Sequence, residues 1–165
     1  LAKNLTVLEN IILGIDKPLL KNIKLSKYKS EIKKVMDLYS LNINLNQYID
    51  ELSVGEKQRV EIIKVLYRGA KILILDEPTA VLVPQEVKEL FKNLRDLKDN
   101  GVTVLFISHK LDEVLEIADD ISVMRSGQMI DTVINNNVSK IQLAEMMIGK
   151  SLPTPPPRIT SAEHY

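Results

Sequence analysis

The sequence contains no cysteine, which excludes a disulfide framework, a thiol nucleophile and a cysteine-type zinc site, and fits a reducing compartment. Its 22 basic and 22 acidic residues leave no net charge, so no global field attracts nucleic acid or an acidic lipid surface. No apolar run approaches the ~20 residues of a membrane-spanning helix, and there is no signal-peptide core. We therefore expect a soluble domain, or one held at a membrane by a partner.

The most informative segment is residues 72–78, Ile-Leu-Ile-Leu-Asp-Glu-Pro. A short, unbroken apolar run is typical of a strand that is buried on both faces of a parallel sheet. Ligands of such sheets bind just beyond the carboxyl ends of the strands, where Asp76 and Glu77 fall. Pro78 ends the strand because it has no N–H. The two carboxylates suit a magnesium nucleotide, with one facing the ion's shell and one the attacking water; the alternative is a solvated acidic turn.

A second informative segment begins a helix over residues 53–69. Ser53 and Glu56 form the S-x-x-E pattern of a capping box, which favours a well-capped helix. The functional interpretation is an anion site, built from the serine hydroxyl and the helix N-terminus, where Gly55 permits a close approach. The two interpretations are compatible, because a phosphate can share those donors.

A third segment follows the next predicted strand, residues 102–107, which a helix beginning at Pro84 separates from the first strand. Strand, helix and strand form a parallel crossover, so Ser108 and His109 are expected at the same sheet edge as Glu77. A histidine in this position can be structural or catalytic, and the sequence leaves both open.

The remaining periodicities complete an α/β pattern. We expect further helices over 4–14, 26–39, 111–118 and 139–148, and a strand pair over 121–124 and 129–133. Residues 144–151 nearly match G-x-x-x-x-G-K-[ST], but a helix precedes them and prolines follow, whereas a phosphate loop follows a strand and opens a helix. No other stretch fits better, so we expect no Walker A loop in this sequence. Residues 151–165 are rich in proline and predict an extended or disordered tail.

Three motifs in this order resemble those of an ABC-type ATP-binding cassette. Residues 52–59 resemble the signature motif, 72–78 the Walker B strand and 107–109 the switch histidine. Residues 67–71 and 78–86 are similar to the first cassette of two-cassette ATPases from bacterial importers of nucleosides and simple sugars.

The resemblance implies a partial P-loop NTPase fold of the α/β class. Residues 1–52 would be part of the helical subdomain. Residues 53–150 would hold the signature helix, a mainly parallel sheet with flanking helices, and a C-terminal β-hairpin and helix. Residues 151–165 would be the tail.

The resemblance also implies roles for single residues. Glu77 would polarise the water that attacks the γ-phosphate of ATP, His109 would contact that phosphate, and Asp76 would orient Mg²⁺ through its water shell. The residues implied to bind the ATP held by a facing cassette are Ser53, Val54, Gly55 and Glu56.

At the level of the whole protein, the resemblance implies the ATPase subunit of an importer at the cytoplasmic face of a bacterial membrane. Its partners would be permease subunits that contact residues 1–52, a second cassette and, indirectly, a solute-binding protein. No nucleic-acid partner is expected.

The sequence departs from the family pattern at three places. Val54 replaces the first glycine of the usual signature pair, and Val83 stands where many cassettes have an aspartate that couples the two sites. The Walker A loop and the glutamine segment, expected before Leu1, are absent, so we expect the isolated chain neither to bind ATP tightly nor to hydrolyse it. An exposed edge on the strand over 72–75 predicts strand exchange or oligomerisation.

Two other functions remain open. One is a cassette ATPase that acts on nucleic acid or in translation, although the long coiled coil or basic linker expected of such relatives does not occur here. The other is a truncated cassette that serves as a non-catalytic binding module.

Overall fold

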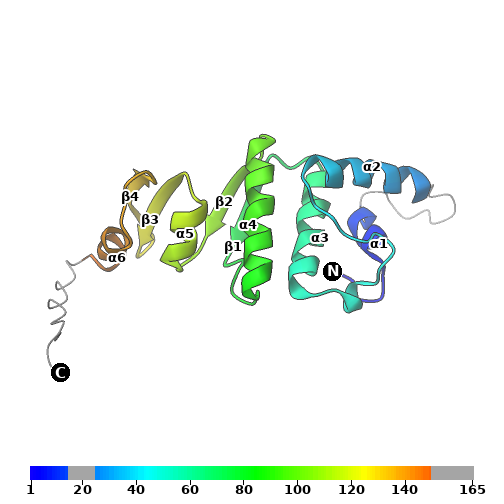
Figure 1. Cartoon of the computed structure of the whole chain (residues 1–165), viewed down its shortest axis with the longest axis horizontal. Helices are drawn as coiled ribbons and strands as arrows, with labels where there is room; N and C mark the ends of the chain where they lie inside the picture. The colour runs from blue at the N-terminus through cyan, green and yellow to red at the C-terminus, as the bar shows by residue number, and fades with distance from the viewer. Residues whose placement is uncertain (15–24, 150–165) are drawn as a thin grey trace, which may run out of the picture. The chain divides into compact units, whose positions relative to one another are not determined.

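The computed structural model describes residues 1–14 and 25–149 (Figure 1), and the contacts among them form two compact units, Leu1–His109 and a second that begins at Lys110. The predicted α/β fold is confirmed: a parallel strand pair with a flanking helix follows the N-terminal helices, and a β-hairpin with a final helix closes the described part. The predicted tail over 151–165 lies outside the described residues.

Three helices build the first part of the first unit: α1 (Val7–Ile12), α2 (Leu25–Leu38) and α3 (Val54–Tyr67). The α3 helix packs against both others, and their apolar faces share a core. Its buried apolar residues include Val7, Ile11, Ile32, Met36, Val60, Ile63 and Leu66. A 3-10 helix (Ile49–Glu51), which the sequence did not predict, leads into α3.

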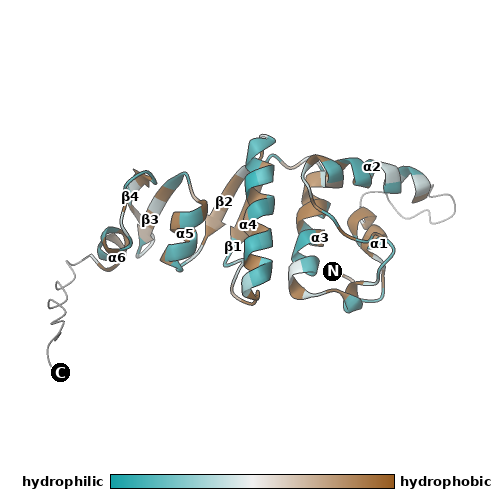
Figure 2. Ribbon diagram, viewed as in Figure 1, coloured by the Kyte–Doolittle hydropathy of each residue, from teal (hydrophilic) through white to brown (hydrophobic). Residues whose placement is uncertain are grey.

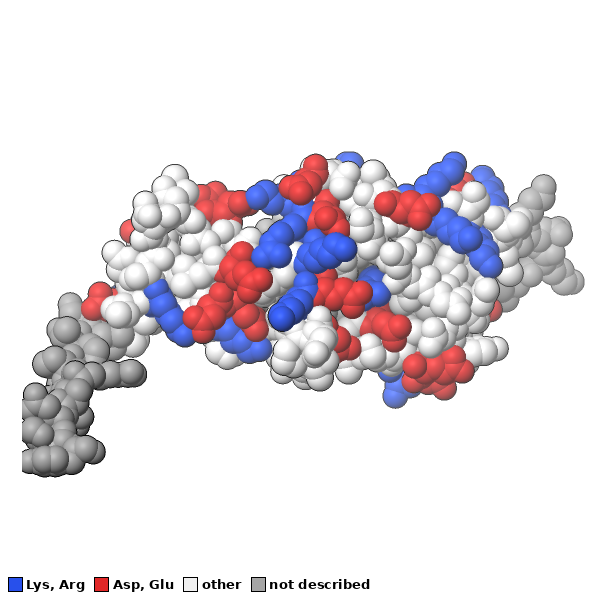
Figure 3. All heavy atoms as spheres, viewed as in Figure 1, with Lys and Arg blue, Asp and Glu red and all other residues white. Residues whose placement is uncertain are grey.

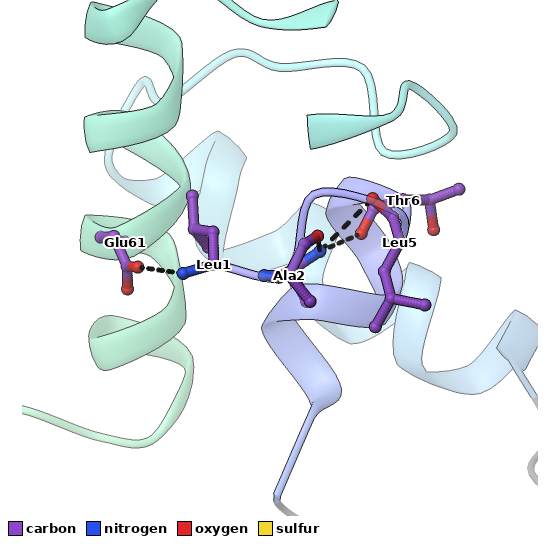
Figure 4. Close-up of polar contacts among 6 residues, drawn as sticks. Leu1, Ala2, Leu5, Thr6 and Glu61 are labelled. Atoms are coloured by element: carbon purple, nitrogen blue, oxygen red, sulfur yellow. Dashed lines mark hydrogen bonds and ion pairs between the residues drawn. The ribbon is translucent and has the colours of Figure 1, made fainter. Parts of the chain in front are cut away.

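A buried asparagine holds the N-terminal segment onto α1. The side chain of Asn10, which is fully buried, accepts a hydrogen bond from Ala2 N at 2.7 Å and donates to the carbonyl oxygens of Ala2 and Thr6 at 3.0 Å each. Figure 4 shows this cluster, with the Leu1 amino group 3.4 Å from Glu61 of α3. Because a buried amide is costly unless its hydrogen bonds are made, Asn10 fixes this local conformation.

The sheet of the first unit consists of β1 (Ile72–Asp76) and β2 (Thr103–Ile107), connected by α4 (Pro84–Asp99). The strands are parallel and in register from Ile72↔Thr103 to Asp76↔Ile107, so both end at the same level. The apolar face of α4 packs on β2, where Phe91 meets Phe106 edge to face with ring centroids 5.8 Å apart. The face of α4 visible in Figure 2 is hydrophilic, as expected of a helix with one side in the core.

The prediction that the first strand is buried on both faces is wrong. Ile72 and Ile74 are 63% and 62% exposed, and Leu105 and Ile107 of β2 are 52% and 45% exposed. Side chains alternate between the two faces of a strand, and within the described ranges α4 packs on one face of this two-stranded sheet. The strands therefore have apolar residues on both faces, as a strand covered on both sides would, but the face away from α4 is exposed.

The second unit contains α5 (Leu111–Ile117), the antiparallel strands β3 (Asp120–Arg125) and β4 (Gln128–Ile134), and α6 (Lys140–Ile148). Ser126 and Gly127 both have positive φ, 51° and 76°, as a two-residue hairpin turn requires. The core contains Ile121, Val123 and Leu143, with partly buried apolar residues of α5, β4 and α6 around it.

The near-match to a phosphate loop falls on α6. Ser139 and Gln142 form a capping box at its start, and Gly149 ends it in the left-handed conformation, with φ of 76°. Residues 144–148 are therefore the end of a helix rather than the start of one, the reverse of what a phosphate loop needs. No helix within residues 1–14 and 25–149 is long and apolar enough to cross a bilayer.

Candidate functional site

The carboxyl ends of β1 and β2 bring an acid and a histidine into contact. Oε1 of Glu77 lies 2.7 Å from Nδ1 of His109 and accepts a hydrogen bond from the His109 backbone N–H at 3.1 Å. The predicted juxtaposition of these two residues is confirmed. It follows from the register, because Asp76 pairs with Ile107 and the next residues of both strands leave the same edge.

The backbone of Glu77 has an uncommon conformation that directs its side chain. Its φ is 47°, in the left-handed region, which costs an L-residue roughly 1–2 kcal/mol. The Glu77 N–H donates to Ile107 O at 2.9 Å, and the Glu77 carbonyl accepts from Ala80 N at 3.2 Å, so both backbone groups hold this bend. Sequence reasoning missed it, because glutamate carries no preference for positive φ.

The second oxygen of Glu77 differs from the first. Oε2 is buried and has no hydrogen-bond partner among the described residues. A buried acceptor without a donor is destabilising, and an ionised carboxylate oxygen can accept from a water. The carboxylate is therefore fixed through Oε1 and keeps acceptor capacity at Oε2.

Asp76 is the last residue of β1 and its side chain is exposed beside Glu77. Within the two described ranges, no three histidine, aspartate or glutamate residues are grouped in a way that could hold a metal ion. Magnesium often takes only one or two protein carboxylates and completes its shell with water and phosphate oxygens. A single accessible carboxylate at this edge fits such an ion.

The start of α3 has the predicted capping box. Ser53 Oγ accepts a hydrogen bond from Glu56 N at 3.2 Å, and the Glu56 carboxylate accepts from Ser53 N at 2.8 Å. Val54, the first residue of the helix, is 48% exposed. The Gly55 N–H belongs to the first turn, whose donors have no partner within a helix.

A carboxylate from α4, which sequence reasoning missed, binds the start of α3. Oε1 of Glu86 accepts from Ser53 Oγ at 2.8 Å and from Gly55 N at 3.2 Å, and Oε2 accepts from Val83 N at 3.3 Å. The Ser53 hydroxyl is the main reason why the pKa of Glu86 lies below its ordinary value, followed by the Val83 N–H. The available signal was the position of Glu86 in the first turn of α4, but nothing in the sequence indicated its partner.

A hollow lies between the N-terminal parts of α3 and α4. Its lining residues are Ser53, Gly55, Glu56, Gln58, Arg59, Ile62, Glu86, Glu89, Leu90 and Asn93. Arg59 crosses it with Nη2 2.6 Å from Glu89 Oε1, and Gln58 Nε2 donates to Pro78 O at 3.1 Å. The lining of this hollow, as far as the structure describes it, includes neither Glu77 nor His109. The chain thus presents two separate groups of predicted site residues, joined by the contact of Gln58 with the turn after Glu77.

Comparisons with known proteins agree with one another. The family model described as ABC transporter matches residues 1–80. The nucleoside import ATP-binding protein NupA of Lactococcus lactis is 46% identical over 147 residues, 89% of this chain and 29% of that protein. The glucose import ATP-binding protein of Haloferax volcanii is 44% identical over 140 residues, 85% of this chain and 24% of that protein.

Solved structures match in the same way. An ATP-binding cassette of an ABC transporter superposes with a TM-score of 0.71 at 31% identity, covering 87% of this chain and 63% of that one. A nucleotide-free cassette gives a TM-score of 0.65 at 30% identity, covering 80% and 56%. The chain therefore spans less than a third of the length of these two curated relatives and less than two thirds of these two structures.

Proposed function

The chain belongs to the ATP-binding cassettes of the ABC transporter family, and we propose that the protein of which it is part hydrolyses ATP to drive the import of a nucleoside or a simple sugar. The observation that carries this proposal is the contact of Glu77 with His109 at the shared strand edge, which leaves Oε2 of Glu77 without a hydrogen-bond partner among the described residues. The names of the relatives, which include nucleoside and glucose import proteins, support the substrate class.

In this proposal Glu77 orients and polarises the attacking water through Oε2. Its contact with His109 fixes the carboxylate through Oε1, and because Oε2 is buried, the groups that cover Oε2 would have to move before a water could bind there. The His109 side chain is 71% exposed, which leaves its other ring nitrogen accessible to a phosphate. Asp76 would orient Mg²⁺ through the ion's water shell, and Mg²⁺, when bound with ATP, would supply positive charge against the charge that develops on the phosphates.

The start of α3 would serve a second nucleotide. Ser53, Val54, Gly55 and Glu56 would face the γ-phosphate of ATP held by another cassette, which the hydroxyl and first-turn N–H groups of α3 would bind. Because the sequence has no phosphate loop of its own, we propose that this chain alone neither binds MgATP tightly nor hydrolyses it. A micromolar dissociation constant in a calorimetric titration would contradict this.

The proposed partners follow the same reasoning. Residues 1–52 would contact permease subunits at the cytoplasmic face of a bacterial membrane, and a solute-binding protein would act through them. Figure 3 shows acidic and basic side chains interspersed over α4. That mixture gives no support to the alternative of a nucleic-acid-dependent ATPase, which needs a patch of positive charge.

The exposed apolar face of β1 and β2 supports a further proposal, that the isolated chain associates with itself. Ile74 and Leu105 are register partners on this face, and both are more than half exposed. A contiguous exposed apolar surface is typical of an interaction site or an aggregation-prone face.

The decisive experiment compares Glu77→Gln with the unaltered full-length protein in an ATPase assay. We expect the substitution to lower kcat by about 10²–10⁴-fold, the range of a general base, while ATP binding is retained. Glu61→Gln, an equal change at an exposed position of α3, should leave the rate unchanged. Hydrolysis by Glu77→Gln at the unaltered rate would refute the proposed role of Glu77. A full-length protein that binds ATP without hydrolysing it would favour a binding module instead.

A further inference from the structure

We propose that Glu86 is an internal competitor for the anion site at the start of α3, and that a phosphate binds there only after the Glu86 side chain has moved away. The inference rests on the proposed role of Ser53 and Gly55 as phosphate donors. It adds a residue of α4 to that site and a step that must precede binding.

The hydrogen bonds of Glu86 use the donors that a phosphate would need. The Ser53 hydroxyl has one proton, which it donates to Glu86 Oε1 at 2.8 Å, while its oxygen accepts from Glu56 N. The Gly55 N–H donates to the same Oε1 at 3.2 Å. An anion at the start of this 14-residue helix also gains from the helix dipole, and Glu86 already has that position.

Glu86 also fills the space beside Gly55. A Cβ atom built on Gly55 would lie 2.8 Å from Glu86 Oε1 and 2.9 Å from its Cδ, closer than real contacts allow. The carboxylate thus lies directly against the glycine backbone. A phosphate oxygen that accepts from the Gly55 N–H would overlap with it, so the exclusion is steric as well as electrostatic.

The charge around the hollow disfavours a second anion while Glu86 stays in place. Its lining contains three carboxylates, Glu56, Glu86 and Glu89, and one guanidinium, that of Arg59. Arg59 is itself paired with Glu89 at 2.6 Å. An incoming phosphate would meet net negative charge, and the departure of Glu86 removes the carboxylate nearest to the two donors.

Glu86 can leave without unfolding α4. Its Oε2 accepts from Val83 N at 3.3 Å, which ties it to the start of its own helix. The side chain of Val83 is apolar and cannot cap α4. The hydrogen bond from the Val83 N–H to Glu86 can persist after the carboxylate has released Ser53 and Gly55. Rotation of the Glu86 side chain can therefore release Ser53 and Gly55 without a change in the backbone of α4.

The test is a titration of the chain, labelled with ¹⁵N-glycine, with inorganic phosphate. The sequence has six glycines, so the Gly55 amide can be resolved, and its signal is assigned from its loss in Gly55→Ala. We expect the dissociation constant for phosphate, read from the Gly55 shift, to be about tenfold lower in Glu86→Ala than in the unaltered chain, because the competing charge-assisted hydrogen bonds are gone.

Two further variants distinguish the displacement of Glu86 from Ser53 and Gly55 from a general effect of removing a negative charge. Asp96→Asn removes one carboxylate from the same helix ten residues further on, about 15 Å away, and should leave the dissociation constant unchanged. Adding Ser53→Ala to Glu86→Ala should abolish the gain. The other glycine signals report whether each variant keeps its fold.

Equal phosphate affinities in the unaltered chain and Glu86→Ala, no Gly55 shift in either, or the same gain in Asp96→Asn would each overturn the inference. The ATPase assay of Glu77→Gln stays independent of this result. A full-length protein without ATPase activity would refute the proposed function and leave the competition of Glu86 with phosphate intact.

Discussion

Replacement of Phe91 by alanine should be the most destabilising single change in the layer that carries the site. Phe91 is 1% exposed on the buried face of α4 and packs edge to face on Phe106 of β2. Truncation of a buried phenylalanine costs about 3–5 kcal/mol, of which the aromatic pair accounts for about 0.5–1.5 kcal/mol. Domains have total stabilities of about 5–15 kcal/mol, so this loss is a large fraction of the whole.

The assay is urea unfolding followed by circular dichroism at low protein concentration. With a slope of about 2 kcal/mol per molar urea, a loss of about 4 kcal/mol lowers the midpoint by about 2 M. Phe91→Leu keeps most of the apolar volume and should lose about 1–2 kcal/mol. Leu105→Ala is the matched control, because Leu105 lies on the exposed face of β2 and is itself 52% exposed; it should cost about 1 kcal/mol or less. A loss below 1 kcal/mol in Phe91→Ala would refute the packing of α4 on the strand pair.

Two other predictions concern pH and association. The Ser53 hydroxyl is the main group that lowers the pKa of Glu86 in the folded chain. The contribution of Glu86 to stability is therefore fully present above the ordinary pKa of a glutamate, and it is lost as the pH falls through the lowered pKa of the folded chain. Arg59 also lowers the pKa of Glu86. If Glu86→Gln and the unaltered chain differed in stability by the same amount at low pH as at neutral pH, the predicted loss of the Glu86 contribution would be wrong. The double variant Ile74→Lys with Leu105→Glu should stay monomeric in sedimentation velocity at concentrations where the unaltered chain associates. An unaltered chain that is monomeric at every concentration would refute self-association through the exposed face of β1 and β2.

The features that could be predicted from the sequence depend on local rules. The capping box of Ser53 and Glu56 is a pattern over four residues, and its hydrogen bonds form within the same turn. The contact of Glu77 with His109 spans 32 residues, yet it was predictable because parallel strands that a helix connects end at one sheet edge.

The features that were missed depend on packing between elements. The contact of Glu86 with Ser53 spans 33 residues and depends on how α4 lies against α3, which no periodicity encodes. Ile74 is exposed because no element of the described chain covers its face of the sheet. The residue type indicates only that burial of an isoleucine is favourable. The left-handed φ of Glu77 is held by the carbonyl of Ile107 on the neighbouring strand and carries no signal in the residue itself.

The hydrogen bond from Gln58 to Pro78 makes two distant parts of the chain mechanically continuous. Pro78 is buried and has no N–H, so its carbonyl is the only backbone group through which it can be held, and a side chain of α3 holds it. A shift of the turn that follows Glu77 would therefore pull on Gln58 and displace the first turns of α3, close to Ser53. If the proposed roles hold, strain at the proposed water site beside Glu77 would reach the proposed nucleotide contact at the start of α3 through the Gln58 side chain and the helix.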